Sequence, residues 1–187
     1  MIFPSHRPAL VALMAAVFQA NLFSAGAQQV LDENLVKAKL LERMVGFVAW
    51  PAATDRGASI PFRVGFFGRT GIAKEYAKLA RGSTIGNRRI EVGYVGARDN
   101  LEGYDLVFIA EVELRRATEI AARLSGKPVL TVCDGRDGGS RGVILSMFIH
   151  EEKIRYDVNL GRARQSGFII HSQMLHYAEK VHDGSAP

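Results

Sequence analysis

A glycine-rich segment is the first place in this sequence where residue types and spacing could carry chemistry. Gly65, Gly68 and Gly71 follow a predicted strand and open a predicted helix, where backbone N–H groups can hold a phosphate. Their spacing is G-x-x-G-x-x-G, which differs from the dinucleotide-binding pattern G-x-G-x-x-G, and no acidic residue ends the following strand to bind a ribose hydroxyl. We therefore interpret residues 65–71 as a tight turn between a strand and a helix.

A second glycine-rich segment, Asp134-Gly-Arg-Asp137-Gly-Gly139, resembles the beginning of a calcium-binding loop. Arg136 occupies the third position, where an oxygen ligand belongs, and no glutamate stands at the twelfth. We interpret this segment as a flexible loop.

The histidines and the single cysteine do not form a recognisable catalytic or metal site. His171 and His176 are five residues apart, which places them on different faces of a helix, whereas a zinc site requires i, i+4 spacing or a carboxylate partner. Cys133 ends an apolar run without a CxxC partner or a nearby base, so we predict a buried structural thiol. Because no G-x-S-x-G elbow or motif-placed carboxylate pair is present either, the sequence predicts no enzyme, no cofactor and no metal.

The elements that would position these residues alternate between helical and strand patterns. Apolar residues recur at helical spacing over residues 31–48, and Trp50-Pro51 ends this helix because the residue before a proline is displaced from helical geometry. Buried-type strands are predicted at residues 62–67, 90–95, 106–109 and 128–133, and helices at residues 71–80 and 111–124. Residues 143–149 and 154–160 predict a hairpin with the turn His150-Glu-Glu-Lys153, and a closing helix is expected at residues 170–181.

Apolar strands that alternate with helices predict an α/β fold. We expect a single three-layer domain whose mostly parallel sheet is flanked by helices and carries an antiparallel C-terminal hairpin. The domain should span residues 28–187, because neither repeats nor low-complexity linkers divide the chain.

The N-terminal residues predict export. His6 and Arg7 precede the apolar run Ala9–Phe18, and Ala25-Gly-Ala27 supplies small residues for cleavage between Ala27 and Gln28. The alternative, a membrane anchor, needs roughly 20 apolar residues, and Gln19 interrupts the run before that length. We therefore expect a signal peptide at residues 1–27 and a periplasmic, soluble mature protein.

The charge balance gives little support to a nucleic-acid partner. The formal net charge of the 187-residue chain is +5, and the basic residues are spread along the sequence rather than concentrated on one segment. We predict no nucleic acid among the partners.

Four segments together resemble the YfiR-like family of periplasmic regulatory proteins. They are Val36-Lys-Ala-Lys-Leu-Leu41 leading into Phe47-Val-Ala-Trp-Pro51, the strand Lys127-Pro-Val-Leu-Thr-Val-Cys-Asp134, the hairpin Gly142-Val-Ile-Leu-Ser-Met-Phe148 with Ile154-Arg-Tyr-Asp-Val-Asn-Leu160, and the closing segments Ala163–Gly167 and Ser172–Ala178. The resemblance covers residues 31–182 in the family's order, and it marks Trp50, Pro51 and Asn159 as possible structural hallmarks or partner contacts. The best-known members pair cysteines in disulfides, which the lone Cys133 of this chain cannot do.

The resemblance implies a regulatory binding role. Characterised members bind the periplasmic sensor part of a membrane-anchored diguanylate cyclase and hold down cyclic-di-GMP synthesis. The sequence does not decide whether the protein forms a homodimer. Two other classes of function are also compatible with it. One is a small-ligand binding or sensor protein for another membrane receptor, because the ends of parallel strands form a ready crevice. The other is an envelope enzyme, which no motif in the sequence supports.

Overall fold

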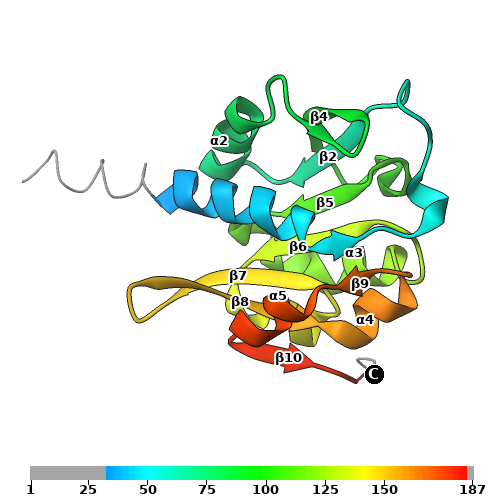
Figure 1. The fold of residues 1–187 in the computed structure, drawn as a ribbon. Helices are drawn as coiled ribbons and strands as arrows, with labels where there is room; N and C mark the ends of the chain where they lie inside the picture. Colours follow the sequence, from blue (N-terminus) through cyan, green and yellow to red (C-terminus); the bar gives the residue numbers. More distant parts are fainter. Residues whose placement is uncertain (1–32, 185–187) are drawn as a thin grey trace, which may run out of the picture.

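The computed structural model describes residues 33–184 and shows two sheets and several helices (Figure 1). The first helix spans residues 33–46. In chain order it is followed by β1 (Val48–Ala49), η1 (Ala52–Thr54), β2 (Phe62–Phe67), α2 (Gly71–Leu79), β3 (Thr84–Ile85), β4 (Arg88–Val95), η2 (Leu101–Gly103), β5 (Leu106–Ile109) and η3 (Glu111–Arg116). The remaining elements are α3 (Ala117–Arg123), β6 (Leu130–Asp134), η4 (Arg136–Arg141), β7 (Leu145–His150), β8 (Lys153–Asn159), α4 (Leu160–Gln165), β9 (Ile169–Ile170), α5 (Ser172–Tyr177) and β10 (Lys180–His182).

The main sheet has the strand order β10-β8-β7-β6-β5-β2-β4-β3. The strands β4, β2, β5, β6 and β7 run parallel to one another, β8 is antiparallel to β7, and β10 is parallel to β8. A second, two-stranded sheet pairs β1 with β9. The predictions of a mostly parallel sheet and an antiparallel C-terminal hairpin are therefore confirmed.

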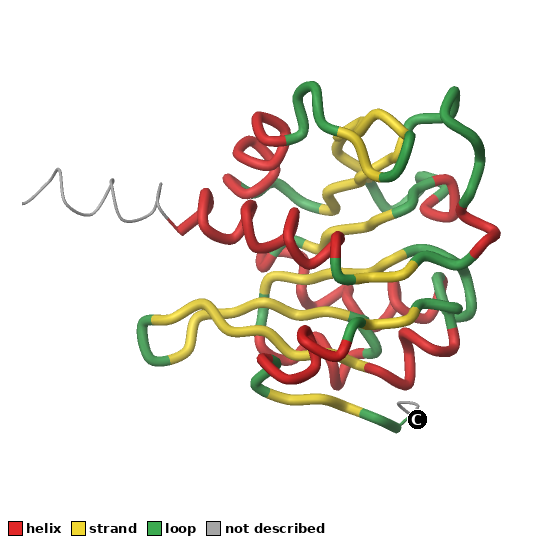
Figure 2. Tube along the Cα trace, viewed as in Figure 1, coloured by secondary structure: helices red, strands yellow, loops and turns green. Residues whose placement is uncertain are grey.

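Helices cover both faces of the main sheet and make a three-layer arrangement (Figures 1 and 2). One face packs against the first helix, α2 and α5, with Leu41, Phe66 and Phe108 among the fully buried side chains. The opposite face packs against α3 through a separate cluster that includes Ile109 and Ile120. Strand β5 is buried along its whole length, as its continuous apolar run predicted.

Three predicted helices need correction. The first helix ends at residue 46 rather than 48, because Val48–Ala49 forms β1 and pairs with Ile169–Ile170 of β9. The first half of the predicted helix 111–124 is the 3-10 helix η3, and only Ala117–Arg123 is α-helical. The predicted closing helix 170–181 is wrong at both ends, since it is divided into β9, the short helix α5 and the strand β10. Here tertiary pairing overrides the helical composition of the segment.

The hairpin between β7 and β8 turns where the sequence predicted. Glu151 and Glu152 both have positive φ values, 50° and 60°, which is the backbone of the two-residue turns that join twisted antiparallel strands. These turns usually contain Asn and Gly, so two glutamates hold this backbone at some conformational cost.

A buried ion pair fastens the strands at one end of the sheet. Arg88, at the start of β4, donates hydrogen bonds to both carboxylate oxygens of Asp105 at 2.8 and 2.7 Å. The same guanidinium also donates to the backbone carbonyls of Thr54, Ile60 and Pro61. Asp105 in turn accepts a hydrogen bond from the backbone N–H of Arg63 in β2. The pair thus connects β4, β2 and the start of β5.

Within residues 33–184, no helix combines the length and hydropathy that crossing a bilayer requires.

Candidate functional site

Two surfaces on opposite faces of β8 are the candidate functional sites. Side chains of a strand alternate between the two faces of its sheet. Tyr156 of β8 packs toward the first helix and α5, whereas the next residue, Asp157, lines a polar cleft on the other side. We call the first surface the apolar groove and the second the polar cleft.

The apolar groove lies between the first helix and α5 and encloses about 130 Å³. Its lining is mostly hydrophobic. Leu40 and Met44 come from the first helix, Phe47 directly follows that helix, Tyr156 comes from β8, and Met174 and Tyr177 come from α5, with Arg43 and Gln173 at the rim.

The first helix contributes to the groove with a second apolar stripe beside the one that it buries. Ala38, Leu41 and Val45 face the core and are fully or nearly fully buried, as the periodicity predicted. Leu40 and Phe47 lie on an adjoining face and are half-buried, and Val36, one turn before Leu40, is 49% exposed. This helix therefore offers hydrophobic side chains both to the core and to the surface.

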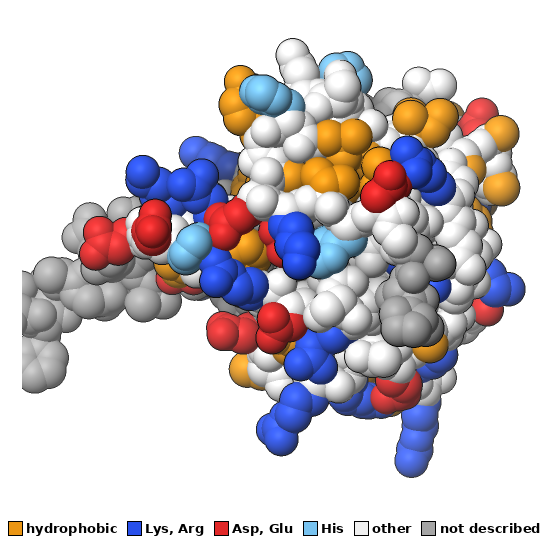
Figure 3. All heavy atoms as spheres, turned by 90° about the horizontal axis from the view of Figure 1, so that it is seen from below, with side chains coloured by type: hydrophobic (Ala, Val, Ile, Leu, Met, Phe, Trp, Pro, Cys, Tyr) orange, Lys and Arg blue, Asp and Glu red, His pale blue; other side chains and the backbone are white. Residues whose placement is uncertain are grey.

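Local hydrogen bonds hold α5 in place on the other side of the groove. His171 caps the helix, since its Nδ1 accepts a hydrogen bond from the backbone N–H of Gln173 at 3.3 Å. The Tyr156 hydroxyl donates to the backbone carbonyl of Met174 at 2.8 Å. Tyr177, in the last turn of α5, remains 73% exposed. The face seen from below likewise shows hydrophobic side chains gathered among histidines and charged groups (Figure 3).

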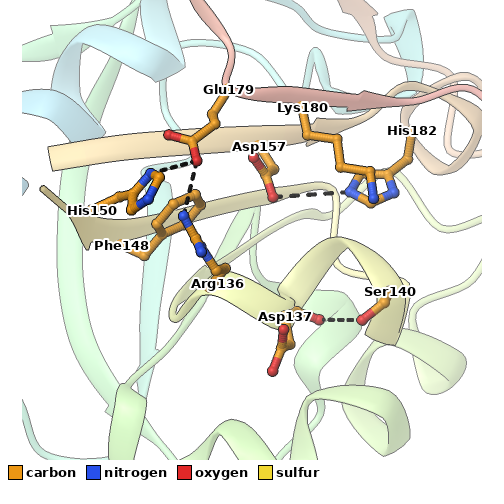
Figure 4. A pocket seen from close by; sticks show the side chains of 9 residues that line it. All are labelled: Arg136, Asp137, Ser140, Phe148, His150, Asp157, Glu179, Lys180 and His182. Carbon is orange, nitrogen blue, oxygen red and sulfur yellow. Dashed lines mark hydrogen bonds and ion pairs between the residues drawn. The ribbon is translucent and has the colours of Figure 1, made fainter.

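The polar cleft lies between η4, β8 and β10 (Figure 4). Glu179, just before β10, is its main ionic centre. One carboxylate oxygen, Oε1, lies 2.9 Å from Arg136 Nη2 and 2.7 Å from His150 Nδ1. The Arg136 guanidinium also stacks over the Phe148 ring at 4.9 Å. These contacts tie η4, β7 and β10 together.

Asp157 lies at the floor of the cleft and is the least solvated of its charged groups. Its side chain is only 7% exposed, and Oδ2 lies 3.9 Å from His182 Nε2. The other oxygen, Oδ1, is buried and accepts no hydrogen bond within the described part of the chain. Burial raises the pKa of Asp157 and Glu179 adds to this, whereas His182 and a hydrogen bond from the Lys180 backbone act in the opposite direction.

The position where similar sheets bind their ligands is covered by the first helix. In doubly wound sheets ligands bind where the strand order reverses, outside the carboxyl ends of the strands; here that point lies between β2 and β5. The first helix covers it. Lys37 binds the buried carboxylate of Asp134 at 2.7 Å and Glu33 at 2.8 Å. Although desolvation lowers the pKa of Lys37, hydrogen bonds to these two carboxylates raise it above its usual value.

The two glycine-rich segments are both packed against neighbouring side chains. A side chain at Gly71 would collide with Asn34 of the first helix, and one at Gly138 would collide with Cys133 and Ser146. The segment 65–71 is the turn from β2 to α2 that the sequence predicted. The segment 134–139, interpreted as a flexible loop, instead contains the last residue of β6, Gly135 and the first four residues of the 3-10 helix η4, whose Gly138 lies against Cys133. The prediction of a buried thiol is confirmed, because Cys133 is 0% exposed and burial strongly raises its pKa.

The residues marked by the family resemblance lie at packing positions. The Trp50 ring is half-buried and meets the rings of Phe62 and Phe168 edge-on at 4.9 and 5.2 Å. Pro51 precedes the 3-10 helix η1. Asn159, 1% exposed, accepts a hydrogen bond from the Arg162 backbone N–H to cap α4 and donates one to the Gly139 carbonyl. The proposed cleavage site at Ala27 and Gln28 lies outside the described residues.

The residues that make the groove and the cleft are not among the site residues that the sequence predicted. Tyr156 and Asp157 lay inside a predicted strand, where alternation alone could have placed them on opposite faces. His150 and His182 meet carboxylates 29 and 25 residues away in the chain, Glu179 and Asp157, so spacing gave no signal. Within the described residues no three His, Cys, Asp or Glu side chains gather as metal ligands.

Comparison with known proteins identifies the chain's family. The model of the YfiR/HmsC-like family matches residues 34–179, which include nearly all of the first helix, the strands β1 to β9 and α5. No curated protein matches the chain. Because the match covers far more than half of the sequence, the chain belongs to the YfiR/HmsC-like family.

Proposed function

We propose that this protein is exported after cleavage between Ala27 and Gln28 and represses a membrane-anchored diguanylate cyclase by binding its periplasmic part. Members of the YfiR/HmsC-like family act in general as periplasmic regulators of such cyclases and are regulatory rather than catalytic. The observation that carries the proposal is the family match over residues 34–179, since it includes every element that lines the apolar groove.

The apolar groove is the surface that we assign to the cyclase. Binding energy in protein interfaces concentrates in a few residues, with Trp, Tyr and Arg enriched among them. Tyr177 and Arg43 stand at the groove, and Leu40 and Phe47 offer apolar surface beside them. A hydrophobic segment of the partner that covered these side chains would remove from water the 73% of Tyr177 that is exposed.

Repression follows from differential affinity. A regulator that binds the inactive conformation of a sensor more tightly than the active one shifts the population toward the inactive state. A tenfold difference in affinity corresponds to about 1.4 kcal/mol of this bias. The regulator itself needs no catalytic group for this task.

The proposal is tested by deleting the gene in its own host and measuring cyclic-di-GMP while the cyclase is expressed. Deletion should raise the dinucleotide level, and the wild-type gene should restore it. Tyr177→Ala should fail to restore it, because the groove loses its exposed aromatic side chain. Tyr94→Ala is the matched control: Tyr94 is also an exposed tyrosine, at 55%, but lies on β4 far from the groove in the strand order.

The outcomes separate two parts of the proposal. An unchanged cyclic-di-GMP level after deletion would exclude repression altogether. Full restoration by Tyr177→Ala, at protein levels equal to wild type, would keep repression but remove the apolar groove as the docking surface.

A further inference from the structure

The polar cleft is a hollow of about 480 Å³ on the face of the sheet opposite the apolar groove. Its origin is the connection between β6 and β7. This connection is the short 3-10 helix η4 rather than a full crossover helix, so this face of β8 and β10 is left partly uncovered (Figure 4). The volume lies within the range of small-molecule sites, roughly 300–1,000 Å³.

Three charged or titratable groups of the cleft, Arg136, His150 and Glu179, already bind one another. Arg136 and His150 both bind Glu179, and Arg155 lies 3.7 Å from the same carboxylate. These groups fix the wall of the cleft, and a ligand that bound them would first have to break existing ion pairs.

Two other charged groups of the cleft, Asp157 and Lys180, stand side by side. Lys180 of β10 is the registered partner of Asp157 in the parallel pair β8–β10, so the two side chains emerge on the same face. Asp157 Oδ1 is buried and accepts no hydrogen bond within residues 33–184, and the charge of the neighbouring Lys180 attracts this carboxylate. A buried carboxylate oxygen without a donor is costly, and its persistence suggests that a ligand supplies the donor.

We propose that the cleft binds a small amphoteric molecule that carries an ammonium group together with a carboxylate or phosphate group. The ammonium binds the Asp157 carboxylate, and the acid group accepts from Lys180 with His182 beside it. A purely cationic ligand would be repelled by Lys180 and Arg136, and a purely anionic one by Asp157. This inference concerns the opposite face of β8 from the groove and does not depend on cyclase repression.

The test is isothermal titration calorimetry on the purified mature protein. L-alanine and O-phosphoethanolamine are the amphoteric probes and distinguish a carboxylate from a phosphate ligand. Ethylamine, acetate and inorganic phosphate carry only one of the two charges. The wild-type protein should bind at least one amphoteric probe and bind each single-charge probe at least about tenfold more weakly.

Variants assign the binding to the two residues. Asp157→Asn and Lys180→Met should each weaken binding about tenfold or more. Lys153→Met, at the other end of β8, is the matched control and should bind as wild type does. Melting curves verify that each variant folds.

Three results would overturn the inference. They are the absence of binding for both amphoteric probes, unaltered affinity in a folded Asp157→Asn variant, and binding of a single-charge probe as tight as that of the amphoteric ones.

Discussion

Neutralising a buried carboxylate that binds a ligand should stabilise the free protein, whereas neutralising one that holds the fold together should destabilise it. Asp157 can be tested for this difference. Its buried Oδ1 has no hydrogen-bond donor among the described residues. The charged and titratable groups that line the cleft with it are His150 of β7, Arg136 and Asp137 of η4, and Glu179, Lys180 and His182 of the β10 segment. Replacing an ionised buried carboxylate by its neutral amide removes the desolvation cost while the backbone contact can persist.

We therefore predict that Asp157→Asn raises the free energy of unfolding at neutral pH by about 0.5–2 kcal/mol. The pKa of Asp157 is raised in the folded state above its unfolded value of 3.8, so ionisation of this group disfavours folding. As the pH falls, the folded wild type takes up a proton before the unfolded chain does, and its penalty disappears. The stability difference between variant and wild type should thus shrink with acidification in urea titrations. A variant less stable than wild type at neutral pH would contradict this.

Trp50 provides a second test at the level of a single residue. Its ring packs edge-on against Phe62 and the buried Phe168, so Trp50→Ala should lower the free energy of unfolding by about 2–4 kcal/mol. The indole Nε1 has no hydrogen-bond partner within the described chain. Trp50→Phe, which keeps an aromatic ring and removes that donor, should cost less than about 1.5 kcal/mol. Thermal melts check both values; an unchanged melting temperature for Trp50→Ala with loss of the partner would assign the residue to the interface instead.

At the level of the elements, the ion pair of Arg88 and Asp105 joins three strands that are separated in the sequence. Removing one member of a buried pair leaves the other charge without compensation. Asp105→Ala should therefore destabilise the protein by about 3–5 kcal/mol, and Asp105→Asn by less, because the amide oxygen can still accept from the Arg63 N–H. Chemical denaturation measures both. Equal effects of the two variants would show that the charge, and not the hydrogen bond, decides the stability.

Six strands of the main sheet, β2 and β4 to β8, could be predicted from the sequence because each carries its own local signal. The apolar run of β5 and the polar turn between β7 and β8 are local patterns, and both predictions are confirmed. The closing segment has no such local signal: Ala178-Glu-Lys180 has helical composition, yet residues 180–182 pair with β8. Ala178 is extended, with φ −65° and ψ 140°, and ends α5.

The candidate sites were less predictable than the strands for a related reason. Asp157 and Lys180 become neighbours only through the β8–β10 register, and Arg88 meets Asp105 only because β4 and β5 flank β2. Such contacts depend on strand order, which residue spacing does not encode. Helical periodicity could have predicted the half-exposed stripe of Val36, Leu40 and Phe47. It was overlooked because the adjoining buried stripe gives a stronger apolar pattern.

At the level of the whole molecule, the first helix determines where binding can occur. Its N-terminal turns cover the strand-order switch point with Lys37 and Asn34, the position at which related sheet architectures hold their ligands. Both candidate surfaces are instead found toward the β8–β10 edge of the sheet. Binding and release at this edge do not require the central strands of the sheet to rearrange.

Processing of the whole chain gives a further prediction. If Ala25 and Ala27 direct cleavage, the mature protein should begin at Gln28. Intact-mass spectrometry of the protein from the envelope fraction tests this, and substitution of Ala27 by a bulky residue, as in Ala27→Trp, should leave the precursor uncut. Recovery of a chain that begins at Met1 from wild-type cells would exclude cleavage.

Strand β10 has a kinetic consequence. It is held at the sheet edge through only three registered residues, Lys180 to His182, whereas β5 is flanked on both sides and fully buried. Short edge segments open locally at a free energy well below that of global unfolding. The amide protons of β10 should therefore exchange with deuterium long before those of β5. Each such opening also moves Lys180 away from Asp157. Local opening of β10 therefore limits how long the proposed ligand can stay bound between these two residues.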